Sequence, residues 1–403
     1  MPLRPDRAIV SIERARAILD AHGEPLERTE RLPLNRLAGR VLAERVIAPG
    51  DVPPFARAAM DGYAVIARET SGATAAVPAI LRSVEMVYTG SVPARAVTPG
   101  TCAGIATGAP LPPGADAVVM VEHTSRAGDG VHVHASVDVG QHVSPRGADI
   151  RAGDEVLDAG AYLAPSRAGV IAALGLTEAV VYARPRVAVL STGDEVVLPG
   201  TPLGPGQIHD VNSTTLAAVI AEHGGEPVAH PPVRDDRAAL EAAFDASLNA
   251  DLVLVSGGSS VGERDYVLDL LESRGEIRFS GVAVKPGKPT IFAVVHGIPV
   301  FGMSGNPTSC LTNAYLFVAP LLRRIARLPA VRPRTVDATL SRRVVSPAGR
   351  HQFYPVRLRN GVAEPSFKGS GEITSLAAAD GYFEIEADRE TVEAGEGVRV
   401  VLF

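Results

Sequence analysis

The chain has 403 residues, of which 46% are hydrophobic and 21% charged, and this balance excludes disorder as its main state. The net charge of −6, the 4% aromatic content and the absence of tryptophan argue against a nucleic-acid partner, which needs basic patches or stacking platforms. At roughly 150 residues per domain, the length predicts two to four domains.

The start of the sequence and its apolar runs indicate a cytoplasmic protein. The start lacks the apolar region of a signal peptide, and no run approaches the ~20 apolar residues that cross a membrane. The two cysteines, Cys102 and Cys310, are too few for a disulfide framework and lack zinc-site spacing. We therefore expect no membrane partner.

The N-terminal part of the chain predicts helices on either side of a β-rich insert. Apolar residues share one helical face from 11 to 22, with Ser11 as the N-cap and Gly23 as the stop. Further helices are expected at 37–45 and 166–174. Between about 51 and 145, short β-like runs are broken by glycine and proline, at 63–66, 117–121 and 131–134.

From about residue 184, apolar strands alternate with helices. Strands are expected at 186–190, 251–255, 290–295 and 298–301. Helices are expected at 212–223, 236–248, 264–274 and 307–327. This alternation predicts a parallel sheet with helices on both faces. After about 330, alternating residues and turns predict a separate small β domain.

Glycines and residues with hydroxyl groups follow the carboxyl ends of two of these strands. An open parallel sheet binds its ligands just beyond these ends. They form a candidate nucleotide or phosphate site of Gly257, Gly258, Ser260, Gly305 and Asn306. Glycines let the backbone approach a phosphate, and helix N-termini offer free N–H groups. Asn306 as N-cap and Pro307 at the first helical position predict a helix start there. Ordinary turns and simple capping remain open as alternatives.

Carboxylates occur at the same strand ends, namely Asp194, Glu195, Asp210 and Asp265. Carboxylates beside a phosphate site favour Mg²⁺ bridging phosphate oxygens, and Asp210 and Asp265 are the candidate metal ligands. Each of them could instead be a helix cap or a solvated charge.

Lysine is almost absent from the chain. Only three of the 39 basic residues are lysine, and two of them, Lys285 and Lys288, lie in one Lys-Pro-Gly-Lys-Pro segment. A compact ammonium is not interchangeable with a guanidinium at an oxyanion site, so the pair predicts anion binding. Chance placement in a turn is the alternative.

Seven segments, in this order, resemble the MoeA family of molybdopterin molybdenumtransferases, whose relatives include the gephyrin E domain. They are 59–65 (AMDGYAV), 107–110 (TGAP), 146–150 (RGADI), 191–195 (STGDE), 255–265, 285–289 (KPGKP) and 304–307 (SGNP). The resemblance covers nearly the whole chain. It departs from the family pattern at 55–59, where an Asp-Asn-Ser run is usual, at Ser259, where valine is common, and at Ser304, where proline is usual.

The resemblance implies a multidomain α/β plus β fold. Its parts would be a discontinuous helical/β domain I (1–50 and 146–183), an inserted β domain II (51–145), a central MogA-like α/β/α parallel-sheet domain III (184–329) that binds nucleotide and molybdopterin, and a C-terminal β-barrel domain IV (330–403). It also implies a homodimer whose active site is shared between subunits. A transient contact with a MogA-like adenylyltransferase is a further expected partnership.

The implied reaction inserts molybdate into adenylylated molybdopterin and releases AMP, assisted by Mg²⁺. By the resemblance, the molybdate side would be formed by Lys285, Lys288, Ser309, Arg350 and Ser370. The polar residues around pyrophosphate, metal and pterin would be Asp61, Thr107, Asp149, Glu195, Asp210 and Asp265.

Two other functions stay open from the sequence. A molybdopterin adenylyltransferase, acting one step earlier, would fit the sheet domain alone, but not the extra domains or the Lys-Pro-Gly-Lys-Pro segment. A dimeric non-catalytic scaffold, which the gephyrin E domain also is, or a divergent paralogue would fit the departure at 55–59.

Overall fold

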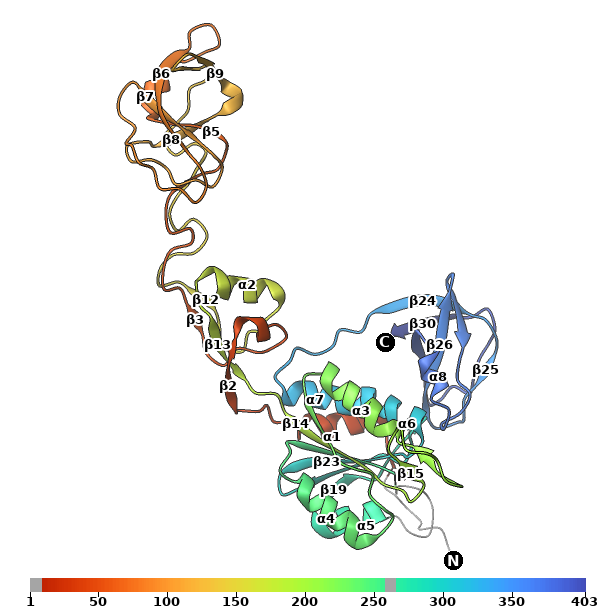
Figure 1. Cartoon of the computed structure of the whole chain (residues 1–403). Helices are drawn as coiled ribbons and strands as arrows, with labels where there is room; N and C mark the ends of the chain where they lie inside the picture. Colours follow the sequence, from red (N-terminus) through yellow and green to blue (C-terminus); the bar gives the residue numbers. More distant parts are fainter. Residues whose placement is uncertain (1–8, 258–265) are drawn as a thin grey trace, which may run out of the picture. The chain divides into compact units, whose positions relative to one another are not determined.

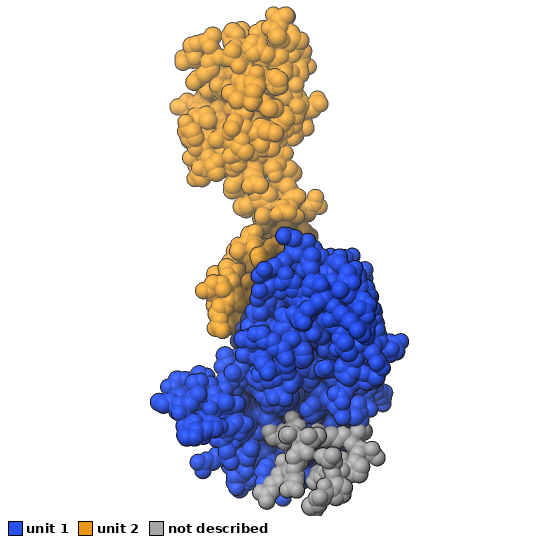
Figure 2. Space-filling view, turned by 90° about the vertical axis from the view of Figure 1, so that its right-hand side faces the viewer, with its two compact units in different colours: residues 1–30, 39–41, 181–403 blue, residues 31–38, 42–180 orange. Residues whose placement is uncertain are grey.

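A computed structural model describes residues 9–257 and 266–403. Contacts within the chain divide it into two compact units (Figure 2). The first comprises the described residues of Met1–Glu30, Gly39–Val41 and Val181–Phe403, and the second comprises Arg31–Ala38 and Leu42–Val180. The finer division into four domains stays a prediction. Among the described helices, none is long and apolar enough to cross a membrane.

The second unit is built around a six-stranded, mostly antiparallel sheet. Its strand order is β8-β5-β7-β6-β10-β9, and β6 and β7 pair in parallel. The strands are β5 (Gly62–Val65), β6 (Ala79–Val87), β7 (Thr101–Ile105), β8 (Ala117–Met120), β9 (Thr124–Ala127) and β10 (Gly130–Val133). Two apolar clusters, around Ile105 and around Val131, form its core. The predicted runs at 63–66, 117–121 and 131–134 are therefore confirmed as strands.

Short elements complete the second unit and lead into the first. They are β2 (Thr29–Pro33), the 3₁₀ turns η1 (Leu34–Arg36), η2 (Ala67–Thr70) and η3 (Val121–His123), β3 (Val46–Ile47), β4 (Arg57–Ala58), β11 (Val143–Ser144), β12 (Glu155–Leu157), α2 (Pro165–Ala173) and β13 (Glu178–Tyr182). Strand β4 pairs with β11, and β3 pairs with β12. Helix α2 confirms the helix expected at 166–174.

The prediction of a helix at 37–45 is wrong. Gly39 has a left-handed φ of +80°, which interrupts a helix. Beyond it, the N–H of Leu42 donates to Ala161 O at 2.9 Å and that of Ala43 to Val180 O at 3.0 Å. In a helix, these N–H groups would donate to carbonyls four residues earlier in the chain. Here they bond to distant segments, so a helix does not form.

The first unit contains a six-stranded sheet with helices on both faces (Figure 1). Its order is β17-β14-β18-β23-β22-β19. The first four strands run parallel, β22 runs antiparallel to them, and β19 pairs antiparallel with β22. The strands are β14 (Arg186–Ser191), β17 (Glu226–Ala229), β18 (Leu252–Ser256), β19 (Glu276–Phe279), β22 (Ile291–Val295) and β23 (Ile298–Met303). The alternation predicted from the sequence is confirmed, with an antiparallel edge in addition.

Every strand of this sheet except β17 contributes side chains to two cores. Val187 and Val189 of β14 pack with α1, α3, α6 and α7, whereas Ala188 and Leu190 pack with α4 and α5. This explains why the strands are continuous apolar runs. The helices are α1 (Ile12–Asp20), α3 (Val211–Glu222), α4 (Arg237–Ser247), α5 (Tyr266–Arg274), α6 (Pro307–Asn313) and α7 (Ala319–Ile325), the last two joined by a π-helical turn, η4 (Ala314–Val318).

The C-terminal part of the first unit is a closed β-barrel. Strands β26, β27, β24, β30 and β28 pair in sequence, and β28 pairs back to β26. The barrel strands are β24 (Thr335–Leu340), β26 (His351–Arg359), β27 (Val362–Pro365), β28 (Gly381–Ile385) and β30 (Gly397–Leu402). Smaller elements are β1 (Ile9–Val10), β15 (Val196–Val197), β16 (Ile208–His209), β20 (Gly281–Val282), β21 (Val284–Lys285), β25 (Val344–Val345), α8 (Thr374–Ala377) and β29 (Thr391–Val392).

Candidate functional site

The carboxyl ends of β14, β18 and β23 lie at one edge of the sheet. The ladders pair Ser191 with Ser256 and Ser256 with Met303. Beyond the ladders, Thr192 N donates to Ser256 O at 2.8 Å, and Gly257 N donates to Met303 O at 3.2 Å. The three segments that the sequence marked therefore continue side by side past the last paired residues.

Two glycines open the backbone at this edge. Gly257 has φ +102°, and a Cβ there would lie 2.3 Å from Thr192 O, so no larger residue fits. A Cβ on Gly305 would lie 3.5 Å from Gly257 Cα, which places the two glycines against each other. This is the open backbone that a phosphate cradle requires. The other predicted residues of this loop, Gly258, Ser260 and Asp265, lie outside the described residues.

The start of α6 carries the next group of predicted residues. Asn306 occupies the N-cap position, as predicted, but its side chain makes no capping hydrogen bond. Instead, its Nδ2 donates to Ser370 Oγ at 3.4 Å, and Thr308 N donates to Ser370 O at 3.0 Å. Thr308 Oγ1 also donates, to Glu372 O at 2.8 Å. The barrel loop with Ser370 thus lies directly on the first turn of α6.

Asp210 is the N-cap of α3 and is buried, with only 4% of its surface exposed. Its Oδ1 accepts from Ser213 N at 2.9 Å and Ser191 Oγ at 3.0 Å, and its Oδ2 accepts from Ser213 Oγ at 2.6 Å. A carboxylate has about four acceptor positions, so these three bonds leave about one for a cation. Asp210 therefore links β14 to α3 whether or not a metal is bound.

The described residues fit Mg²⁺ only as an ion held together with a substrate. Within 9–257 and 266–403, no three histidine, cysteine or acidic side chains come together as a metal centre. Mg²⁺ commonly uses one or two carboxylates plus phosphate oxygens, which Asp210 could satisfy in part. Glu195 is exposed on the same edge of the sheet. Burial raises the pKa of the nearby Asp235, and the negative charges of Glu195 and Asp194 raise it further.

The two lysines of the Lys-Pro-Gly-Lys-Pro segment have no counter-charge among the described residues. Both side chains are half-buried, and neither ammonium has a carboxylate within 4.0 Å in the part of the chain that the structure describes. Lys285 ends β21, which pairs in parallel with β26 so that Lys285 stands opposite Gln352. Arg350 comes directly before β26, next to this ladder.

A buried asparagine on α6 holds the lysine segment. Asn313 Nδ2 donates to Gly287 O at 2.7 Å and also to the hydroxyl of Thr290. A Cβ on Gly287, which has φ +102°, would lie 2.1 Å from Asn313 Nδ2, so the packing requires glycine. Ser309 lies one turn earlier on the same helix and is also buried. The structure therefore ties the predicted lysines to the helix that carries Ser309.

Three predicted residues belong to the second unit. Asp61 Oδ1 accepts from Thr107 N at 2.7 Å and from Thr107 Oγ1 at 3.0 Å, which lowers the pKa of Asp61. Asp149 is exposed, and its N–H donates to Val52 O at 3.0 Å. The structure joins Asp61 to Thr107 directly, and among the described residues no hydrogen bond connects Asp149 to them.

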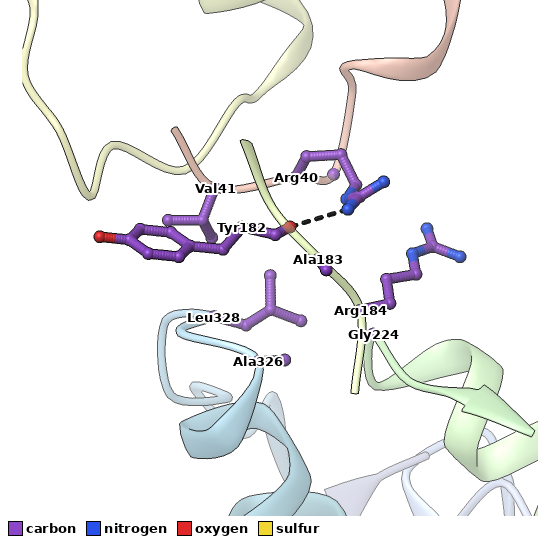
Figure 3. Close-up of a pocket in the computed structure, with 9 residues that line it drawn as sticks. Arg40, Val41, Tyr182, Ala183, Arg184, Gly224, Ala326 and Leu328 are labelled. Atoms are coloured by element: carbon purple, nitrogen blue, oxygen red, sulfur yellow. Dashed lines mark hydrogen bonds between the residues drawn. The ribbon is translucent and has the colours of Figure 1, made fainter. Parts of the chain in front are cut away.

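Two cavities in the first unit are lined by none of the predicted site residues. One, beside Arg40 and Tyr182, measures about 10 Å³, which is roughly room for a single water (Figure 3). There Arg40, buried, donates to Tyr182 O at 2.7 Å. The other, about 330 Å³, is lined by the acidic residues Glu13, Glu386 and Asp388, which would repel an anionic substrate.

Sequence reasoning missed Asn313 and Asn212, both buried amides that bond to the glycine segments. Asn212 Nδ2 donates to Ser256 Oγ at 2.7 Å and to Gly305 O at 2.9 Å. The available signal was an asparagine inside a helix, where its short side chain is unfavourable unless it has a specific partner.

Comparison with known proteins confirms the resemblance. The chain matches the MoeA N-terminal region (domains I and II) at 10–175, a probable molybdopterin-binding domain at 188–324 and the MoeA C-terminal region (domain IV) at 337–403. It is 39% identical to molybdopterin molybdenumtransferase 2 of Mycobacterium tuberculosis, over 92% of this chain and 94% of that protein. It is 34% identical to molybdopterin molybdenumtransferase of Haemophilus influenzae, over 93% of this chain and 94% of that protein.

Solved structures agree with this assignment. Two crystal structures of a molybdopterin biosynthesis MoeA protein from Pyrococcus horikoshii match with TM-scores of 0.84 and 0.82 and sequence identities of 38% and 32%. Each match covers 98% of this chain, and 99% and 100% of the respective Pyrococcus chains. The chain therefore belongs to the MoeA family of molybdopterin molybdenumtransferases.

Proposed function

We propose that the chain inserts molybdate into adenylylated molybdopterin and releases AMP, as a step of molybdenum cofactor biosynthesis. Relatives that cover most of its length are named molybdopterin molybdenumtransferase, which supports the enzyme class. The observation that carries the proposal is the pair of half-buried ammonium groups of Lys285 and Lys288, which have no carboxylate partner among the described residues and whose segment Asn313 ties to α6.

The lysine pair is suited to an oxyanion. A partly buried ammonium without a counter-charge is costly, because burial removes water and nothing replaces it. A dianion such as molybdate would offset that cost for both lysines, and charge-assisted hydrogen bonds to its oxygens are stronger than neutral ones. Asn313 fixes the backbone between the two lysines, so little ordering is required when the anion binds.

The glycine edge is suited to the adenylate. Gly257 and Gly305 present backbone that can approach a phosphate closely, and Asn306 and Ser370 add polar side chains at the start of α6. Mg²⁺, when bound, would neutralise phosphate charge, with Asp210 among the residues that hold it. Holding the dithiolene and the oxyanion close together would then supply much of the rate increase.

We further propose that the active form is a homodimer in which Asp61, Thr107 and Asp149 complete the partner's site. The Asp61–Thr107 pair supports this, because its two hydrogen bonds favour the charged carboxylate and hold it in one orientation. A transient contact with a MogA-like adenylyltransferase would deliver the adenylylated substrate.

The test supplies the purified chain with adenylylated molybdopterin, molybdate and Mg²⁺, and measures AMP and molybdenum-loaded cofactor together. We expect both products in equal amounts, loss of the reaction without molybdate, and a lower rate with a chelator present. Adenylylation of molybdopterin from ATP in the absence of molybdate would indicate the adenylyltransferase instead. Absence of any binding to molybdate or AMP would leave a scaffold role.

A further inference from the structure

Asn212 connects the two glycine segments of the sheet edge. It is the second residue of α3, and only 7% of its surface is exposed. Its Nδ2 donates to Ser256 Oγ at 2.7 Å, at the end of β18, and to Gly305 O at 2.9 Å, just after β23. Ser256 and Gly305 lie 44 and 93 residues further along the chain, so Asn212 bridges segments from three different elements.

The orientation of the amide follows from its partners. The carbonyl of Gly305 can only accept a hydrogen bond, so the atom facing it must be the amide nitrogen. Both hydrogens of Nδ2 are then used, one on each segment. Because Gly257 follows Ser256 directly and lies against Gly305, these two bonds set the separation between the glycines.

The remaining oxygen of the amide has no partner. Among the described residues, Asn212 Oδ1 is buried without a hydrogen bond, and so is the hydroxyl of Thr192, which lies beside Gly257. Buried polar atoms in native proteins almost always have a partner, so two such acceptors at one sheet edge point to a donor that binds there.

We propose that Asn212 is a positioning residue of the nucleotide site. Its Nδ2 holds the Gly257 and Gly305 segments at the separation that the adenylate phosphate requires, and its Oδ1 accepts a hydrogen bond from an O–H or N–H group of the same nucleotide. This inference rests on the proposed function and adds to it a residue outside the predicted set. It assigns Asn212 to the adenylate half of the substrate and not to the molybdate half.

The test measures AMP binding by calorimetry and steady-state kinetics on the full chain, comparing the parent with Asn212→Ala. We expect the Kd for AMP and the KM for adenylylated molybdopterin to rise at least tenfold, while the KM for molybdate stays within twofold. Ser256→Ala removes one of the two bonds and leaves Asn212 in place, so we expect about a threefold rise. This milder variant keeps the test decisive should Asn212→Ala fold poorly.

The matched control is Ser247→Ala at the end of α4. Ser247 is also fully buried, and its Oγ donates to Phe244 O at 2.6 Å, but it lies in the core on the other face of the sheet. We expect it to lower thermal stability without changing AMP binding. If Asn212→Ala bound AMP like the parent, or if Ser247→Ala lost AMP binding to the same extent, the role of Asn212 would be overturned. The proposed function would then still stand. A parent chain that fails to bind AMP would overturn the proposed nucleotide chemistry as well.

Discussion

Replacing Lys285 or Lys288 by alanine should impair molybdate use without destabilising the fold. A hydrogen bond to a charged group contributes about 1.5–3 kcal/mol. Since 1.4 kcal/mol corresponds to a factor of ten, each substitution should raise the KM for molybdate by about 10- to 100-fold. Neither ammonium has a carboxylate partner among the described residues, so its removal breaks no ion pair with any of them.

The stability of the same variants provides a second measurement. Each lysine is half-buried and has no carboxylate partner in the part of the chain that the structure describes, so its loss relieves desolvation. The free energy of unfolding should therefore change by no more than about 0.5 kcal/mol. Molybdate-dependent AMP release gives the kinetics, and chemical denaturation gives the stability. Arg237→Ala is the control: Arg237 lies on α4, pairs with Glu241 at 2.9 Å and is mostly exposed, so its loss should leave both quantities unchanged.

A parent-like KM for molybdate in both lysine variants would refute the reasoning. So would a large loss of stability with unchanged kinetics, because the ammonium groups would then have a structural partner. We expect the rate of each variant to recover in part at high molybdate concentration, since the lost interaction contributes to molybdate binding.

Three further predictions concern Asn313, Gly257 and His351. Asn313→Ala should destabilise the chain by about 1–3 kcal/mol in denaturant unfolding and raise the KM for molybdate, because the segment around Gly287 loses its anchor. Gly257→Ala should abolish AMP binding in calorimetry, because φ is +102° and the added Cβ would collide with a backbone oxygen 2.3 Å away. The pKa of His351 is raised, chiefly by its hydrogen bond to Glu384 at 2.7 Å. This pair therefore stabilises the fold fully below about pH 6.5, and the contribution is lost as pH rises through the raised pKa. Thermal unfolding at about pH 6 and pH 9 should differ less in His351→Gln than in the parent.

Local sequence signals were sufficient for the four central strands of the six-stranded sheet in the first unit and for the helices that cover it. The strands β14 and β18 are buried on both faces, so their continuous apolar runs are visible without any structure. The Asn306-Pro307 pair marked the start of α6 correctly, because proline at the first helical position is a local preference. The same reasoning failed at 37–45, where Gly39 and hydrogen bonds to distant carbonyls prevent the helix that the composition favours.

Family, fold class and the pair of rare lysines could all be read from the residues in order, because each depends on spacing, composition or a motif. The three-dimensional structure alone determined how the candidate site is assembled. Asn212 and Asn313 hold glycine segments 93 and 26 residues away in sequence, and Ser370 reaches Thr308 from the barrel. Contacts over such separations arise when packed elements bring their ends together, and no local pattern records which buried amide will face which carbonyl.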